Sequence, residues 1–195
     1  YDTPTIRRRV AEMASFFGIQ TWFYKSVTEL SGGQKQLLNL ASVMVLQPKV
    51  LILDEPTSQL DPIAASDFLA TLGKINRELG TTILLTEHRL EEAFGFASRV
   101  AVMDGGKLLC TGTPAEVGAE LKSSGNAMFL AMPAAMRIWA ASDSNAACPI
   151  SVCDGRNWLL DYAKTHELQA IPEETKNAPD TETVVLAQEL WFKYE

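Results

Sequence analysis

Hydrophobic residues recur along the chain in two ways, one typical of helices and one typical of buried strands. Where they repeat every three or four residues, an amphipathic helix is expected. Where they form an unbroken run, a strand buried on both faces of a parallel sheet is expected. Because the two patterns alternate, the sequence predicts an α/β architecture, with helices layered on a mainly parallel sheet. The expected helices cover residues 5–17, 31–46, 63–79 and 89–96, and the expected strands cover 49–53, 82–85, 99–103 and 107–111.

The pattern changes after about residue 118. Just before this point, Thr113 and Glu116 have the spacing of a capping box, which predicts the start of another helix. Small and polar residues at 122–126 are typical of a linker, and a short helix is expected over 157–165. The polar, acidic residues 172–179 are expected to form a second linker.

Two groups of residues predict phosphate chemistry. Ser31, Gly32 and Gly33 stand at an expected helix start, where backbone amides and the helix dipole favour an anion such as a terminal phosphate. Asp54 and Glu55 follow a buried strand, at the sheet edge where ligands of α/β proteins bind. We assign Asp54 to Mg²⁺ and Glu55 to an attacking water. Taken singly, the serine would be a helix cap and the acids a solvated turn.

Composition narrows the class of protein. A formal net charge of −7 argues against nucleic acid or an anionic membrane surface as the main partner, because both attract concentrated lysine and arginine. Three irregularly spaced cysteines do not make a disulfide framework and favour a reducing cytosol. The longest strongly apolar stretch, 127–136, is shorter than the ~20 residues of a membrane-spanning helix.

Four short motifs, in one order, resemble those of the ATP-binding-cassette (ABC) ATPases. Residues 30–36, Leu-Ser-Gly-Gly-Gln-Lys-Gln, resemble the family signature, and residues 50–56 resemble the Walker B strand with its catalytic glutamate. Residues 58–62 are similar to the D-loop, and 86–88 to the segment of the switch histidine. The resemblance covers roughly residues 5–118 and implies a P-loop NTPase-like fold that hydrolyses ATP with Mg²⁺.

The resemblance also implies roles that are divided between two ATPase domains. The signature of one domain reaches the γ-phosphate held by the other domain, so a second ABC domain is an expected partner. His88 would sense the γ-phosphate of its own site, and Asp61 would communicate between the two sites. The signature residues that would contact the partner's nucleotide are Ser31, Gly32, Gly33 and Gln34.

The chain also departs from the family pattern. Leu37 stands where the family usually has an arginine, which affects helix packing rather than phosphate contact. No Gly-x-x-x-x-Gly-Lys-Ser/Thr phosphate loop occurs in the sequence, and the glutamine loop is also missing. We therefore expect a piece of a longer protein, one that binds ATP weakly and is inactive by itself.

The expected domain organisation follows from these motifs. A partial helical signature subdomain is expected at 1–46, the Walker B, D-loop and switch half of the ATPase core at 47–118, and a C-terminal extension with linker at 119–180. Residues 181–195 resemble the first strand of a second ABC domain, with Tyr194 at the position that stacks on adenine. An amphipathic edge strand is the alternative interpretation of this tail.

A tandem cassette with these motifs is similar to the ATPases of energy-coupling-factor importers. The resemblance implies a peripheral ATPase on the cytoplasmic face of the cell membrane that drives uptake of a vitamin or metal ion. Its further partners would be a transmembrane coupling protein and a substrate-binding membrane subunit. Two alternatives stay open, a soluble ABC ATPase of translation or DNA maintenance and an inactive interaction remnant.

Overall fold

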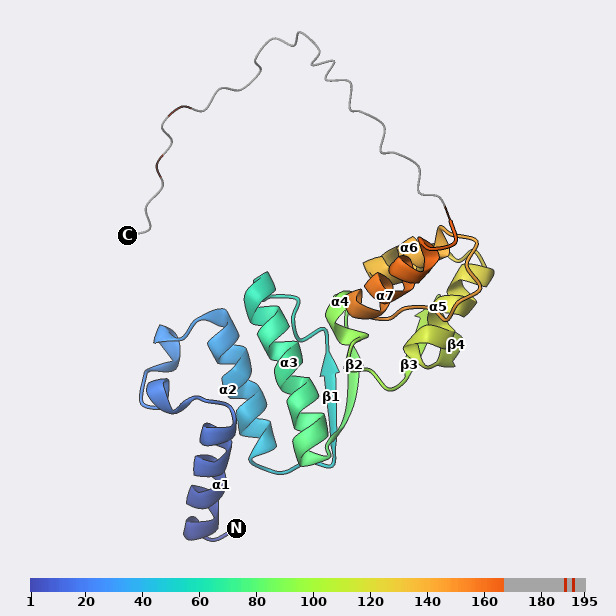
Figure 1. Cartoon of the computed structure of the whole chain (residues 1–195). Helices are drawn as coiled ribbons and strands as arrows, with labels where there is room; N and C mark the ends of the chain where they lie inside the picture. Colours follow the sequence, from blue (N-terminus) through green and yellow to red (C-terminus); the bar gives the residue numbers. More distant parts are fainter. Residues whose placement is uncertain (167–187, 189–190, 192–195) are drawn as a thin grey trace.

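The computed structural model describes residues 1–166, 188 and 191, and it confirms the α/β class. Two lobes are visible in Figure 1. The first lobe runs from α1 to β2, the second lobe runs from β3 to α7, and α4 lies between them. The helices are α1 (Thr3–Phe16), α2 (Gly32–Met44), α3 (Pro62–Leu79), α4 (Leu90–Ala93), α5 (Pro114–Ser123), α6 (Ala134–Ala140) and α7 (Val152–Tyr162). The strands are β1 (Val50–Asp54), β2 (Thr82–Thr86), β3 (Val100–Asp104) and β4 (Lys107–Gly112), with short 3-10 turns at Gln20–Trp22, Val27–Glu29 and Ala127–Ala131.

The first lobe is built by packing α2 and α3 on the sheet of β1 and β2. The side chains of Leu69, Leu72 and Ile75 on α3 are completely or almost completely buried, together with Met44 on α2. They share one core with Leu51 of β1, and Leu53 of the same strand packs against it. The amphipathic period that predicts α3 therefore also selects the residues that fill this core.

The opposite face of this sheet differs from the expectation that both faces are buried. Val50 and Ile52 of β1 are 57% and 69% exposed, and Leu84 of β2 is 60% exposed. The expectation of two-sided burial was wrong for this part of the chain because α2 and α3 cover one face only, and nothing among the described residues packs on the other.

The strands form two sheets rather than one. β1 and β2 pair in parallel, whereas β3 and β4 pair antiparallel in a separate sheet with an irregularity between Val102 and Met103. The hairpin turn uses Gly105 and Gly106 at φ of 53° and 74°, a left-handed conformation that glycine adopts without strain. A mainly parallel sheet is thus seen only in the first lobe.

The second lobe has its own core, centred on α5 and α6. Val117 and Leu121, one helical turn apart on α5, pack against Met136 and Trp139 of α6. The capping box at Thr113 begins α5 as predicted. The helix then runs to Ser123, across the domain boundary expected between residues 118 and 119, because the buried side chains of Val117 and Leu121, on either side of that boundary, face the same core.

The last described helix begins earlier than the sequence predicts. It was expected over 157–165, but α7 starts at Val152. The Ser151 hydroxyl accepts a hydrogen bond from the Asp154 amide at 3.1 Å, and the Asp154 carboxylate accepts one from the Ser151 amide at 3.1 Å. This reciprocal cap fixes the start of the helix. The tail expected at 181–195, with Tyr194, falls outside the described residues except for positions 188 and 191.

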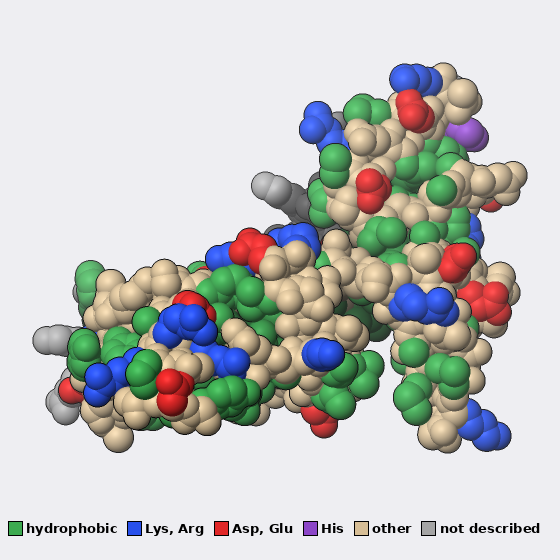
Figure 2. Space-filling model, turned by 90° about the horizontal axis from the view of Figure 1, so that it is seen from below, with side chains coloured by type: hydrophobic (Ala, Val, Ile, Leu, Met, Phe, Trp, Pro, Cys, Tyr) green, Lys and Arg blue, Asp and Glu red, His purple; other side chains and the backbone are tan. Residues whose placement is uncertain are grey.

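Two observations concern membrane-spanning potential and the surface of the described residues. None of the helices there is both long and apolar enough to cross a membrane. Figure 2 shows hydrophobic side chains on the surface of both lobes, intermingled with charged ones.

Burial predicts different reactivity for two cysteines of the second lobe. Burial raises the pKa of the Cys148 thiol to about 11, whereas Cys153 is exposed. Because the thiolate is the reactive form, we expect Cys153 to react with N-ethylmaleimide about tenfold or more faster than Cys148. Peptide mapping by mass spectrometry after timed labelling measures both rates. Equal labelling rates of the two cysteines in the native protein would contradict the described packing of Cys148.

Candidate functional site

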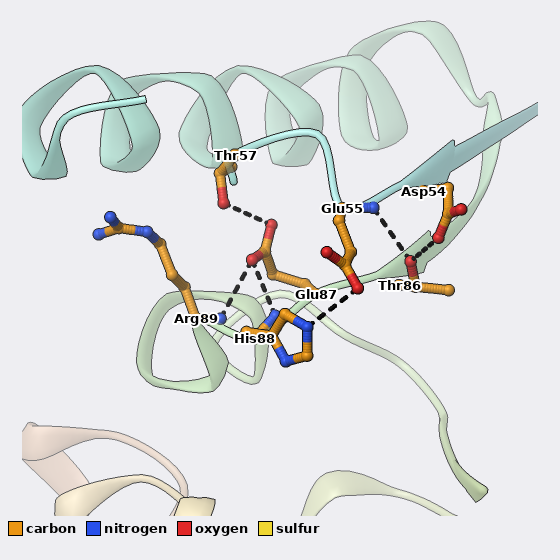
Figure 3. Close-up of polar contacts among 7 residues, drawn as sticks. All are labelled: Asp54, Glu55, Thr57, Thr86, Glu87, His88 and Arg89. Atoms are coloured by element: carbon orange, nitrogen blue, oxygen red, sulfur yellow. Dashed lines mark hydrogen bonds and ion pairs between the residues drawn. The ribbon is translucent and has the colours of Figure 1, made fainter. Parts of the chain in front are cut away.

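The site is built on the parallel pairing of β1 and β2, which brings their carboxyl ends to one edge. Asp54 lies opposite Thr86 in the register. The Thr86 hydroxyl donates a hydrogen bond to Asp54 Oδ1 at 2.5 Å. Parallel pairing therefore places Asp54, at the end of β1, beside Thr86, at the end of β2 and two residues before His88 (Figure 3).

Glu55 continues from β1 in an unusual backbone conformation. Its φ is 42°, in the left-handed region that residues other than glycine rarely adopt. The Glu55 amide is held there by Thr86, whose carbonyl oxygen and hydroxyl oxygen accept it at 3.1 and 3.0 Å. A conformation that costs about 1–3 kcal/mol persists only where its surroundings fix it. The direction of the Glu55 side chain is thus set by the neighbouring strand.

The side chains of His88 and Glu55 are in hydrogen-bond contact at this edge of the sheet. His88 Nε2 lies 2.9 Å from Glu55 Oε1, and the two side chains are 81% and 49% exposed (Figure 3). A pair this exposed contributes at most about 1 kcal/mol to stability. Stability alone is therefore a weak reason for the pairing, and the position of both groups at an open sheet edge favours a chemical role.

Glu87 fixes the backbone that carries His88. Its carboxylate accepts hydrogen bonds from the buried Thr57 hydroxyl at 2.7 Å and from the amides of His88 and Arg89 at 2.8 and 3.1 Å (Figure 3). The segment before α4 is thereby tied to the loop after Glu55. Sequence reasoning missed the roles of Thr57 and Glu87, although an acid directly before His88 was a visible signal.

The predicted signature residues lie at the start of α2. Ser31 is its N-cap: the hydroxyl accepts from the Gln34 amide at 3.3 Å, and the Gln34 side-chain oxygen accepts from the Ser31 amide at 3.0 Å. Ser31 and Gly32 are exposed, so this helix start faces solvent. A Cβ on Gly33 would lie 3.0 Å from Ala64 Cβ, which explains the need for glycine where α2 meets α3.

The signature helix contacts the loop that follows the acidic edge. The link between them is Gln36, whose side-chain amide donates to the carbonyl oxygen of Pro56 at 3.1 Å. Residues 31–34 form no hydrogen bond to Asp54, Glu55 or His88 among the described residues. Asp61 is the N-cap of α3, where its Oδ1 accepts hydrogen bonds from the amides of Ile63 and Ala64 at 3.0 and 2.9 Å.

A groove of about 250 Å³ runs beside the signature. Its lining includes Ser31, Gly33 and Gln34 from the start of α2 and Ala64 and Asp67 from α3. The groove leaves the exposed helix start accessible to a partner molecule. It does not include Glu55 or His88.

The acidic edge carries the carboxylates of Asp54 and Glu55 and the hydroxyl of Thr86. Among the described residues no group of three or more histidine, cysteine, aspartate or glutamate side chains could hold a metal by itself. Mg²⁺ is commonly held by one or two carboxylates together with water and substrate phosphates. Asp54 fits that mode of binding, in which the phosphates complete the coordination.

Comparison with known proteins places these motifs in a family. The ABC transporter family model matches residues 3–58. A Bacillus cereus protein assigned as an ABC transporter ATP-binding protein is 41% identical over 192 residues, which are 97% of this chain and 34% of that protein. A Clostridium tetani protein with the same assignment is 33% identical over 194 residues, which are 100% of this chain and 42% of that protein. The chain thus spans about a third to two fifths of the length of these curated relatives.

Solved structures give the same result for the fold. CbiO1 of Clostridium perfringens, part of the ABC transporter complex CbiONQ, superposes with a TM-score of 0.58 at 35% identity, over 71% of this chain and 55% of its own. An ATP-binding cassette in its ADP conformation, MJ1267, superposes with a TM-score of 0.56 at 23% identity, over 65% of this chain and 49% of its own, and shows the fold alone. The chain belongs to the ABC transporter ATPases.

Proposed function

We propose that this chain is part of the ATP-hydrolysing subunit of an ABC importer, and that Glu55 and His88 carry its chemistry. The observation behind the proposal is their contact at 2.9 Å, at the carboxyl edge of a parallel sheet and beside Asp54. An acid that orients water, a second acid near Mg²⁺ and a group that stabilises phosphate charge are the parts that phosphoryl transfer needs. The edge brings all three together.

In this proposal the side chains act by position and charge. The backbone of Glu55 is fixed by Thr86, so its carboxylate can orient a water and take up its proton during attack on the γ-phosphate. His88 donates a hydrogen bond to the γ-phosphate oxygens as negative charge develops there. Asp54 holds Mg²⁺, which when bound neutralises phosphate charge.

The proposed partner at the signature is a second ATPase domain. Ser31 and Gly32 are exposed, and residues 31–34 form no hydrogen bond to Glu55, which supports a role at a nucleotide held by another domain. We propose that Ser31, Gly32, Gly33 and Gln34 meet the γ-phosphate there, and that Asp61 transmits closure between the sites. Tyr194, outside the described residues, is proposed to stack on adenine in a following tandem domain.

We further propose uptake through membrane subunits, on the cytoplasmic face of the membrane. The likeness to CbiO1, part of an ABC transporter complex, supports an energy-coupling-factor type of importer for a vitamin or metal ion. A spermidine/putrescine import ATP-binding protein of Borreliella afzelii is 40% identical over 126 residues, which are 65% of this chain and 36% of that protein, and it supports import as the direction. A transmembrane coupling protein and a substrate-binding subunit are the proposed membrane partners.

Glu55→Gln in the full-length protein tests the assigned base. The amide keeps the shape of the side chain but no longer accepts a proton, so we expect ATP binding within about twofold of wild type and kcat lower by about a hundredfold or more. Phosphate release and equilibrium nucleotide binding measure the two quantities. Glu78→Gln, at an exposed position of α3, is the matched control. Turnover that survives the Glu55 change would remove this residue from the role of base.

His88→Ala tests the proposed phosphate contact. Loss of one preorganised donor should lower kcat about a hundredfold while nucleotide still binds. The chain has two histidines, and the other one, His166, stacks on Tyr162 in the second lobe. His166→Ala should therefore leave ATP hydrolysis unchanged. A His88 variant with wild-type kcat, measured at saturating ATP, is the result that defeats this assignment.

ATP binding by residues 1–195 alone tests the expectation from the missing phosphate loop. Because no Gly-x-x-x-x-Gly-Lys-Ser/Thr sequence is present to hold the β- and γ-phosphates, we expect a Kd above about 100 μM and no detectable hydrolysis. Isothermal titration calorimetry with Mg-ATP gives the value, and the full-length protein is the positive control. Micromolar affinity of the 195-residue chain would mean that phosphate binding resides in these residues.

A further inference from the structure

The helix after His88 connects the two lobes. α4 begins at Leu90, two residues beyond His88, and lies between the first and second lobes in Figure 1. Leu90 packs against the core of the second lobe. The element that follows the histidine is therefore in contact with a part of the protein that contributes no residue to the site.

A single hydrogen bond joins α4 to α6. Glu91 Oε2 accepts the backbone amide of Ala134, 43 residues away, at 2.9 Å. Ala134 is the first residue of α6, and the N-cap position is Pro133, which offers no side-chain acceptor. Glu91 thus supplies, from another element, an acceptor for one of the first amides of α6, which have no partner within the helix.

The residues that follow Glu91 anchor the same segment on both sides. Phe94 is 4% exposed and belongs to the core of the second lobe. Phe96 packs against the core of the first lobe. A Cβ on Gly73 of α3 would lie 3.7 Å from Phe96 Cβ, which places the ring close to α3. The segment that follows Glu91 is therefore packed against both lobes.

We propose that Glu91 is a positioning residue, through which the second lobe holds α4 and keeps His88 against Glu55. The inference rests on the proposed ATP hydrolysis. Glu91 touches no reacting atom; it ties the start of α6 to a helix that begins two residues after His88. With the Glu91–Ala134 hydrogen bond formed, two contacts restrain the His88 backbone. One is the hydrogen bond from its own amide to Glu87, and the other is the attachment of α4 to α6.

Three variants of the full-length protein separate the hydrogen bond from charge and from packing. Glu91→Ala removes the acceptor, and kcat should fall about threefold to fivefold, the effect of one hydrogen bond, while the KM for ATP stays unchanged. Glu91→Gln keeps a side-chain oxygen that accepts from Ala134 and should restore most of kcat. Glu92→Ala, on the same helix and with no side-chain hydrogen bond among the described residues, is the matched control and should behave as wild type.

Hydrogen exchange provides a measurement that does not depend on turnover. In Glu91→Ala the amides of residues 88–94 and of the first turn of α6 should exchange about threefold to fivefold faster than in wild type, and in Glu91→Gln and Glu92→Ala they should not. Unchanged exchange and unchanged kcat in Glu91→Ala overturn the inference, as does a glutamine variant that is as impaired as the alanine variant. A wild-type protein without ATPase activity, combined with faster exchange in Glu91→Ala, would instead overturn the proposed function and leave the mechanical link standing.

Discussion

The pairing of β1 with β2 is the constraint on which the candidate site depends. It sets Asp54 opposite Thr86, and this one register gives the threonine access to the Asp54 carboxylate and to the Glu55 amide. A shift by one residue would turn Leu51 away from the core and break both contacts. Burial of one apolar face therefore fixes the geometry of the polar edge.

Two side chains, those of Thr86 and Glu87, hold the backbone of the polar edge. Thr86 holds the start of the acidic turn, and Glu87 holds the backbone of the histidine segment through the buried Thr57 hydroxyl. Both supports come from hydrogen bonds between residues about 30 positions apart. These hydrogen bonds of Thr86 and Glu87 fix the backbone that carries the exposed Glu55–His88 pair. A pair at the surface can therefore have a defined geometry without being buried itself.

Sequence patterns predicted the elements better than their surroundings. The helix that carries Leu69, Leu72 and Ile75 was predictable because its apolar period coincides with its buried face. The exposure of Ile52 was not predictable. A run of apolar residues indicates that a strand can be buried on both faces, but it does not show which elements of the chain cover those faces. Parallel pairing of β1 and β2 brings Glu55 and His88 to one sheet edge, whereas the contact of Glu91 with Ala134 depends on a tertiary arrangement that no local pattern encodes.

The left-handed backbone at Glu55 also limits which substitutions report on chemistry alone. Asparagine and glycine tolerate a φ of 42°, but valine and isoleucine are severely hindered there. In a saturation scan of this position, β-branched replacements would combine loss of the carboxylate with a refolded turn that no longer meets Thr86. Only the unbranched, isosteric replacements would separate the carboxylate's contribution from that of the main chain.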